Sequence, residues 1–186
     1  DTREVLIASH HARSRLVGRP AHPLPEGGET LGEAMFEAIL DGVMVCTSAC
    51  LFQRRAALQT GLFDEEMKYS EDAHFFMRLS TLGKFAFSRA MLTRKRQHGQ
   101  NLSHRRNSLP FRRGECLSIG KLSGFLPSAV QREPLRLSSA QSDALARTMP
   151  RLLSGYLYEA SLAGPGEYRE ASRLCWRCGL GSLAMT

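Results

Sequence analysis

The stretch TGLFDEEMKYSED, residues 60–72, gathers acidic side chains directly before an apolar helical pattern. Its five acids are Asp64, Glu65, Glu66, Glu71 and Asp72. If Asp72 begins a helix, apolar residues follow it at i+3, i+4 and i+7 and share its face. These residues are Phe75, Phe76 and Leu79. The spacing therefore predicts a carboxylate at the end of a buried stripe, directed toward a cleft.

A carboxylate in the first turn of a helix lies near free backbone N–H groups and the positive end of the helix dipole, which favour its ionised form. An ionised and partly shielded carboxylate can accept a proton from a substrate hydroxyl. The same residues also suit an ordinary helix start, with Ser70 as the cap and Glu71 and Asp72 in the first turn. From these residues alone, the ordinary helix start is the favoured interpretation.

The flanking segments predict the elements that would position this pair. Apolar, β-branched runs predict strands, and apolar residues at helical intervals predict helices. Strands are expected over residues 4–10, 43–52 and 84–87, and helices over 29–40, 53–61, 72–82, 144–164 and 167–181. Residues 109–133 carry mixed signals and receive little assignment. Gly164-Pro165-Gly166 separates the last two helices and predicts a helical hairpin, so the chain is expected to be α/β with a helical appendix.

The segment TSACLFQRRAALQTGLFDEEMKYSEDAHFFMRLSTLGKFAF, residues 47–87, resembles the second half of the family 2 glycosyltransferases, inverting enzymes of the GT-A fold. That family has a strand with small hydroxylated residues, then an arginine-bearing turn and short helix, then Gly-x-Phe-Asp-Glu. Glu-Asp at the head of a helix follows, and then Gly-Lys and another strand. The resemblance is specific over residues 43–103 and looser over 1–42.

The resemblance implies roles for several residues of the acidic stretch. Asp72 corresponds to the catalytic base and Glu71 to its acidic partner. Gly61, Phe63 and Asp64 correspond to the loop that delivers the pair to the site. In this context a catalytic-type Asp72 becomes the favoured interpretation.

The resemblance continues into RKRQHGQNLSH, residues 94–104, where the family often places an arginine, a histidine and a serine. His98 fills the histidine position, which in some members lies near the metal or the donor diphosphate; a loop histidine in a basic surface is the equal alternative. Arg94 and Arg96 could neutralise a diphosphate leaving group.

The family's Asp-x-Asp motif, which holds Mg²⁺ or Mn²⁺ on the donor diphosphate, occurs nowhere in the chain. Its nucleotide-binding N-terminal half is also not recognisable. The chain is therefore interpreted as an incomplete GT-A (Rossmann-like) sheet portion, with an acceptor-side part over residues 1–108 and a helical extension over 109–186. The partners implied for the intact enzyme are a nucleotide-sugar donor, an acceptor hydroxyl and the missing N-terminal half, and this chain alone is expected to be inactive.

The net charge of +7 is concentrated between Asp72 and Glu115, where ten Lys and Arg residues occur without an acid. Such a block suits a polyanion, and the alternative function is a non-enzymatic basic module that binds nucleic acid or another polyanion. Against it, no aromatic residue stands between Phe87 and Phe111 to stack on bases.

Composition sets the expected compartment. Hydrophobic residues make up 42% of the 186-residue chain, enough for one domain with a core. The sequence carries no transmembrane-length apolar run and no recognisable secretory signal, so a cytoplasmic location is expected. The five cysteines are odd in number, which disfavours a disulfide framework. Cys175 and Cys178 have metal-ligand spacing but no matching second pair, which disfavours zinc.

Overall fold

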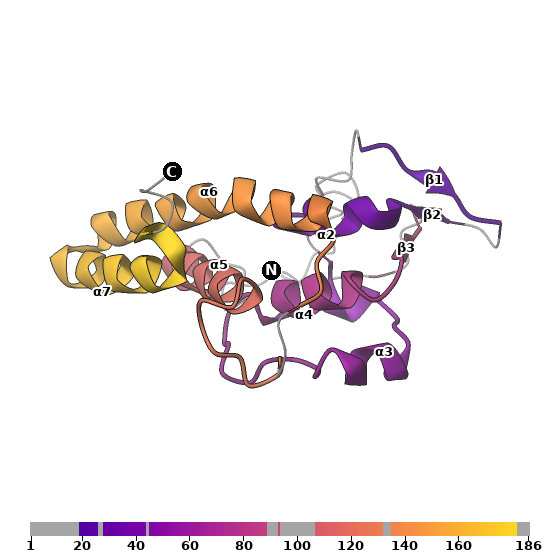
Figure 1. Cartoon of the computed structure of the whole chain (residues 1–186), viewed down its shortest axis with the longest axis horizontal. Coiled ribbons are helices and arrows are strands. Elements are labelled where there is room, and N and C mark those ends of the chain that lie inside the picture. Colours follow the sequence, from indigo (N-terminus) through magenta and orange to yellow (C-terminus); the bar gives the residue numbers. More distant parts are fainter. Residues whose placement is uncertain are drawn as a thin grey trace, which may run out of the picture.

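The computed structural model describes residues 19–25, 28–43, 45–88, 93, 107–131 and 135–181. These residues are mostly helical, with one small antiparallel sheet (Figure 1). The helices are α2 (Met35–Leu40), α3 (Arg54–Gln59), α4 (Glu71–Ser80), α5 (Ser108–Leu122), α6 (Ser139–Ala163) and α7 (Pro165–Cys175). Shorter helical turns are η1 (Gly32–Ala34), η2 (Thr47–Ala49) and the π-type turn η4 (Trp176–Leu180).

The described residues form one sheet of three two-residue strands, β1 (His22–Pro23), β2 (Glu29–Thr30) and β3 (Ala86–Phe87). The strand β2 is central: Thr30 lies opposite His22 on one side and Ala86 on the other, both antiparallel. The sheet stands at one end of the molecule, away from the α6–α7 hairpin (Figure 1). Strands and helices are both present, so an α/β description holds loosely, while a GT-A portion stays a prediction.

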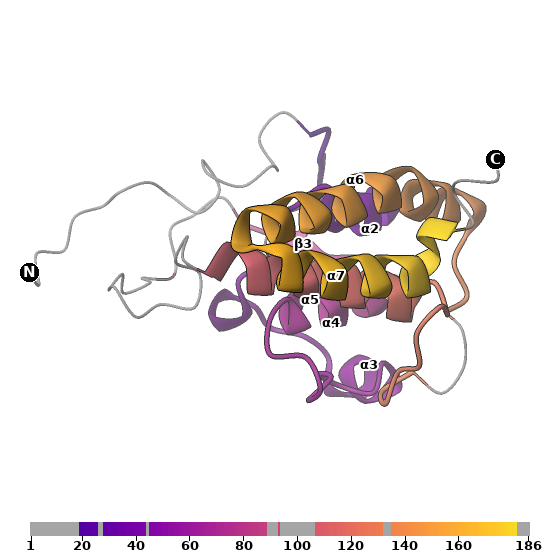
Figure 2. The same cartoon turned by 90° about the vertical axis from the view of Figure 1, so that its left-hand side faces the viewer.

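The C-terminal hairpin forms where the sequence predicts it. Ser138 caps α6 by accepting a hydrogen bond from the Gln141 N–H at 3.3 Å, and the Gln141 side chain accepts from the Ser138 N–H at 3.0 Å. This reciprocal pair is a capping box. Gly164, at φ 129°, ends α6, and Pro165 begins α7, a position where its missing N–H costs no hydrogen bond. The two helices pack side by side, with α5 against both of them (Figure 2).

One hydrophobic core joins the N-terminal and C-terminal helices. Its buried side chains come from α2, α4, α5, α6 and α7, and α4 packs against both α2 and α5. Phe75, Phe76 and Leu79 are all buried, which confirms the predicted apolar stripe of α4. This core contains residues from both sides of the expected boundary between 108 and 109. The division into parts 1–108 and 109–186 stays a prediction.

The strand expected over residues 43–52 is wrong for the described part of that segment. Residues 47–49 form the turn η2, and the flanking residues form no strand. An apolar, β-branched run becomes a strand only when a neighbouring strand pairs with its backbone, and none does so here among the residues that the structure describes. Leu51 is consequently 102% exposed, and the Phe52 ring is half-exposed.

Other boundaries differ in smaller ways. The helix expected over 29–40 is confirmed only for η1 and α2, because Glu29 and Thr30 pair in the sheet. The little-assigned region 109–133 contains the 15-residue helix α5. The strand expected over 4–10 lies outside the described residues. Within the described ranges, no helix is long and apolar enough to cross a membrane.

Candidate functional site

The loop between α3 and α4 begins at a glycine that the backbone requires. Gly61 has φ 80°, and its N–H donates to the Leu58 carbonyl while the Leu62 N–H donates to the Ala57 carbonyl, both at 3.1 Å. These two bonds form the Schellman pattern that ends α3. A Cβ at Gly61 would lie 2.1 Å from the Val130 carbonyl oxygen, so a side chain would clash as well as strain the backbone.

Arg78, in the last turn of α4, holds the start of the same loop. Its guanidinium donates to the carbonyls of Thr60 and Leu62, the second at 2.6 Å, and its Nε donates to the His74 carbonyl at 3.3 Å. Burial lowers the pKa of Arg78 to about 10, so the side chain remains a cation at neutral pH. The buried cation therefore ties backbone carbonyls together and does not face solvent.

Asp64 anchors the middle of the loop through a buried ion pair. Its Oδ2 accepts from Lys121 Nζ of α5 at 2.7 Å, and its Oδ1 accepts from the Glu66 N–H at 3.1 Å. Burial by itself raises the pKa of Asp64, but the hydrogen bonds from Lys121 and Glu66 outweigh it and lower that pKa. Lys121 also donates to Glu66 Oε2 at 2.8 Å. The Asp64 carboxylate is thus ionised and fully engaged in holding the loop on α5.

His74 lies in the protein interior between α4 and α5. Its Nδ1 is 3.1 Å from the Ser118 hydroxyl, and its Nε2 is buried with no hydrogen-bond partner in the described part of the chain. Burial, assisted by the nearby Arg78 cation, lowers the pKa of His74 to about 3. The imidazole is therefore neutral at physiological pH and serves as an uncharged packing group.

Phe63 fastens the loop to the apolar side of α4. Its ring stacks on Phe75 at a centroid distance of 4.4 Å. Phe75 in turn meets Phe76 edge-to-face at 5.1 Å, and Phe52 contacts both rings. Gly61, Phe63 and Asp64, which the resemblance assigns to the loop, thus each make a fixed contact that holds it.

Glu71 and Asp72 follow at the head of α4, both half-buried. Asp72 Oδ1 accepts from the Ala73 N–H at 2.7 Å, and this is its only hydrogen bond to the residues that the structure describes. Burial raises the pKa of Glu71, and the neighbouring Asp72 charge raises it further. Ser70 takes a left-handed conformation at φ 60° and makes no capping bond, so the predicted serine cap is wrong. Its hydroxyl donates to the Phe111 carbonyl of α5 at 3.4 Å instead.

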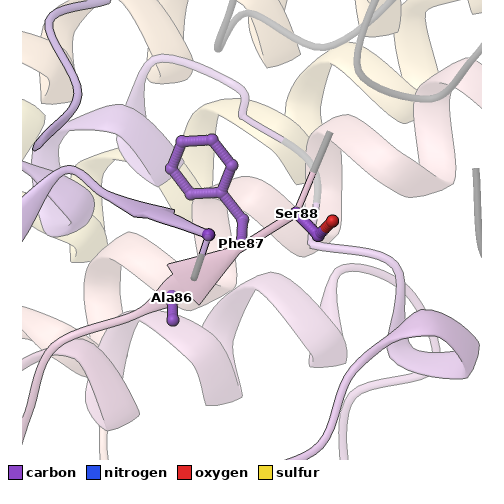
Figure 3. A pocket seen from close by; sticks show the side chains of 4 residues that line it. Ala86, Phe87 and Ser88 are labelled. Carbon is purple, nitrogen blue, oxygen red and sulfur yellow. The ribbon is translucent and has the colours of Figure 1, made fainter. Parts of the chain in front are cut away.

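The predicted donor-side residues His98, Arg94 and Arg96 lie outside the described residues. Two hollows in the described part are considered for a site, and neither is lined by Glu71 or Asp72. The first, of about 340 Å³, is an open depression beside the sheet, formed by Gly28, Ala86, Phe87 and Ser88 (Figure 3). The second lies between the loop and the C-terminal helices.

No group of three or more His, Cys, Asp or Glu side chains in the described ranges is arranged to hold a metal ion. Glu71 and Asp72 supply two adjacent carboxylates, fewer oxygens than Mg²⁺ or Mn²⁺ requires. The described residues therefore do not form the divalent-cation site that the resemblance implies.

Three cysteines form a buried cluster. The sequence spacing brings Cys175 and Cys178 together but gives no sign of Cys116. Cys116 Sγ lies 3.9 Å from Cys175 Sγ and 3.6 Å from Cys178 Sγ, and all three side chains are buried. Cys116 is 59 residues from Cys175, so its approach depends on how α5 packs against α7. The arrangement is that of free thiols in a tightly packed core.

The basic stretch between Asp72 and Glu115 has fewer cations free to bind a polyanion than its charge suggests. Arg78 is internal, Arg112 pairs with Glu115 at 2.8 Å, and Arg113 pairs with Glu170 at 3.1 Å. Three of its ten cations are thus engaged within the protein, and the polyanion-binding alternative stays a prediction with no further support.

Sequence reasoning missed Lys121 and Arg78, which hold the loop, and the buried contact between His74 and Ser118. A lysine and an arginine within apolar helices are weak local signals of buried pairs, because both residues more often face solvent.

The chain was compared with protein-family models, with curated proteins and with solved structures, and it matches none of them.

Proposed function

We propose that this chain contributes the acceptor-side base of an inverting, GT-A-type glycosyltransferase of family 2 character. In the intact enzyme, Asp72 takes the proton of an acceptor hydroxyl. The resemblance over residues 43–103 supports the assignment. The observation that carries it is a half-buried carboxylate without an ion pair in the described ranges, presented by a loop anchored at Gly61, Asp64 and Ser70.

The environments of the nearby acids favour Asp72 as the base. Asp64 is committed to Lys121 and is buried, so no substrate hydroxyl reaches it. Glu71 has a raised pKa and the Asp72 charge beside it. Asp72 makes one hydrogen bond in the described part of the chain, so its carboxylate retains acceptor capacity. A base must be fixed, accessible and able to accept a proton, and Asp72 meets these requirements best.

The proposed step is a single displacement. The Asp72 carboxylate receives the hydroxyl proton as the acceptor oxygen forms a bond to the anomeric carbon of the donor sugar. The bond between that carbon and the diphosphate oxygen breaks, the diphosphate leaves with the electron pair, and the configuration at carbon inverts. The Mg²⁺ or Mn²⁺ that the resemblance implies would neutralise charge on that leaving group.

A donor survey tests this function. The full-length protein, expressed from its complete natural gene, is incubated with uridine and guanosine diphosphate-sugars, Mn²⁺ or Mg²⁺, and a mixture of hydroxyl acceptors. Acceptor-dependent release of a nucleoside diphosphate, together with an inverted anomeric product by NMR, is expected. A product that retains the donor configuration would contradict the single displacement. The 186-residue chain by itself is expected to be inactive in the same assay.

A further inference from the structure

The second hollow, between the anchored loop and the C-terminal helices, has the dimensions of a small-molecule site. Its volume is about 390 Å³, within the range of ligand pockets. The loop contributes Met67 and Tyr69, α5 contributes Leu109 and Leu117, and α6 contributes Tyr156. Its walls therefore include apolar and aromatic side chains, and charged side chains complete the lining.

Close packing fixes these walls before any ligand is present. Gly114 of α5 faces the loop, and a Cβ there would lie 2.4 Å from the Tyr69 carbonyl oxygen. Only a residue without a side chain permits this approach. The Tyr69 ring meets Phe111 of α5 edge-to-face at a centroid distance of 5.1 Å. The aromatic side of the hollow is thus held against a helix and does not need to order on binding.

Tyr156 supplies a polar group at the hollow. Its side chain is only 1% exposed, and the residue lines the hollow. Burial raises the pKa of Tyr156 to about 12, so the hydroxyl keeps its proton at neutral pH. A protonated hydroxyl at the wall of a hollow can both donate a hydrogen bond to a bound molecule and accept one from it.

The charges around the hollow balance. Four charged side chains line it, and two of these are already paired: Glu66 with Lys121 at 2.8 Å and Arg113 with Glu170 at 3.1 Å. The other two have opposite signs and are Lys68 and Glu167. A phosphate or a nucleotide would need a surplus of positive charge, which this lining does not offer.

We propose that this hollow binds an uncharged glycoside, with its sugar ring against the partly exposed Tyr69, a ring hydroxyl bonded to Tyr156 and an apolar aglycone among the aliphatic residues. The C–H faces of a sugar suit aromatic surfaces, and its edge supplies hydroxyls. Tyr69, on the anchored loop, precedes Asp72 in the first turn of α4 by three residues. The identification of this ligand as the transfer acceptor rests on the function proposed above.

Saturation-transfer NMR with phenyl β-D-glucoside tests the site in the full chain. Binding is expected, with phenol and phenyl phosphate binding less tightly. Tyr156→Phe removes one neutral hydrogen bond and should weaken binding by about 2- to 12-fold. Leu117→Trp fills the hollow and should abolish the signal. Tyr158→Phe, on the same helix but 64% exposed, is the matched control and should bind like the wild type.

Each contrary result overturns a defined part of the inference. Absence of phenyl glucoside binding by the folded chain, or binding that is unchanged in both Tyr156→Phe and Leu117→Trp, overturns the site. Phenol or phenyl phosphate binding as tightly as the glucoside overturns the ligand class. Asp72→Asn should leave glucoside binding by this chain intact and should remove transfer by the intact enzyme, so failure of this site and failure of the proposed base are separate outcomes.

Discussion

Replacing Lys121 with methionine removes the buried cation while keeping an unbranched side chain of similar length. In the wild type, Lys121 Nζ lies 2.7 Å from Asp64 Oδ2 and 2.8 Å from Glu66 Oε2. The Asp64 side chain is 0% exposed. The substitution therefore leaves a buried carboxylate that retains only its hydrogen bond from the Glu66 N–H.

The expected loss follows from the burial of each partner. Removing one partner of a buried ion pair destabilises a protein by about 3–5 kcal/mol, because the other charge stays desolvated. The contact with Glu66 adds little, since that side chain is 65% exposed and surface pairs contribute about 0–1 kcal/mol. For a chain of this size, the total corresponds to a fall in melting temperature of about 6–20 °C.

Urea unfolding at pH 7, followed by far-UV circular dichroism, measures this loss. Glu66→Gln is the control for the exposed arm and should change the unfolding free energy by less than about 1 kcal/mol. The double variant Asp64→Asn/Lys121→Met removes both buried charges and should be more stable than Lys121→Met alone. That recovery distinguishes an unpaired charge from a packing defect.

Acid pH supplies a second signature of the same pair. Because the pKa of Asp64 is lowered in the fold, its ionisation contributes stability above its ordinary value of 3.8, and this stability is lost as the pH falls through the lowered pKa. In Lys121→Met the hydrogen bond and charge of Lys121 no longer oppose the effect of burial, so the pKa of Asp64 should rise and the difference in stability from the wild type should narrow toward pH 3. A loss below about 1 kcal/mol at pH 7, or a gap that does not change with pH, would refute the ion-pair account.

Three further substitutions, one of them with a matched control, test the scaffold by thermal or urea unfolding. Phe76→Ala should destabilise by about 3–5 kcal/mol, whereas Leu51→Ala, at a fully exposed site, should leave the melt unchanged; equal effects would contradict the assigned core. Gly61→Ala should destabilise by about 1–3 kcal/mol or more, from its positive φ and the clash with Val130, and a neutral effect would contradict the loop geometry. Burial lowers the pKa of His74 from 6.5 to about 3, so the unfolded chain binds a proton there that the folded chain does not. Stability should therefore fall by about 1.4 kcal/mol per pH unit as the pH drops between these values, and His74→Gln should flatten that slope if the histidine is its source.

Local patterns predicted the elements whose signals lie within one segment. The apolar stripe of α4 follows from the spacing of Phe75, Phe76 and Leu79, and the α6–α7 hairpin follows from Gly164-Pro165-Gly166. The C-terminus of α3 was also predictable, because Gly61 takes the left-handed conformation that ends the helix.

Features that depend on distant partners were not predictable from local pattern. The inner face of α5 includes Gly114, Ser118 and Lys121, residues that do not indicate a buried helical face. Lys121 is 57 residues from Asp64, so the ion pair that fixes the loop has no sequence-local signal. The strand expected over residues 43–52 fails for the converse reason: its composition is apolar, but no residue in the described ranges pairs with it as a neighbouring strand.

The central claim is tested most directly by the rate of sugar transfer of the Asp72→Asn variant. This rate is measured in the full-length protein, expressed from its complete natural gene. Asparagine keeps the size of the side chain and removes the proton acceptor, so sugar transfer to the acceptor hydroxyl should fall by about 10²-fold or more while the thermal melt is preserved. Glu65→Gln, an exposed acid of the same loop, is the matched control and should transfer at the wild-type rate. Near-normal transfer by Asp72→Asn, or an equal loss in both variants, would contradict the assignment of Asp72 as the base.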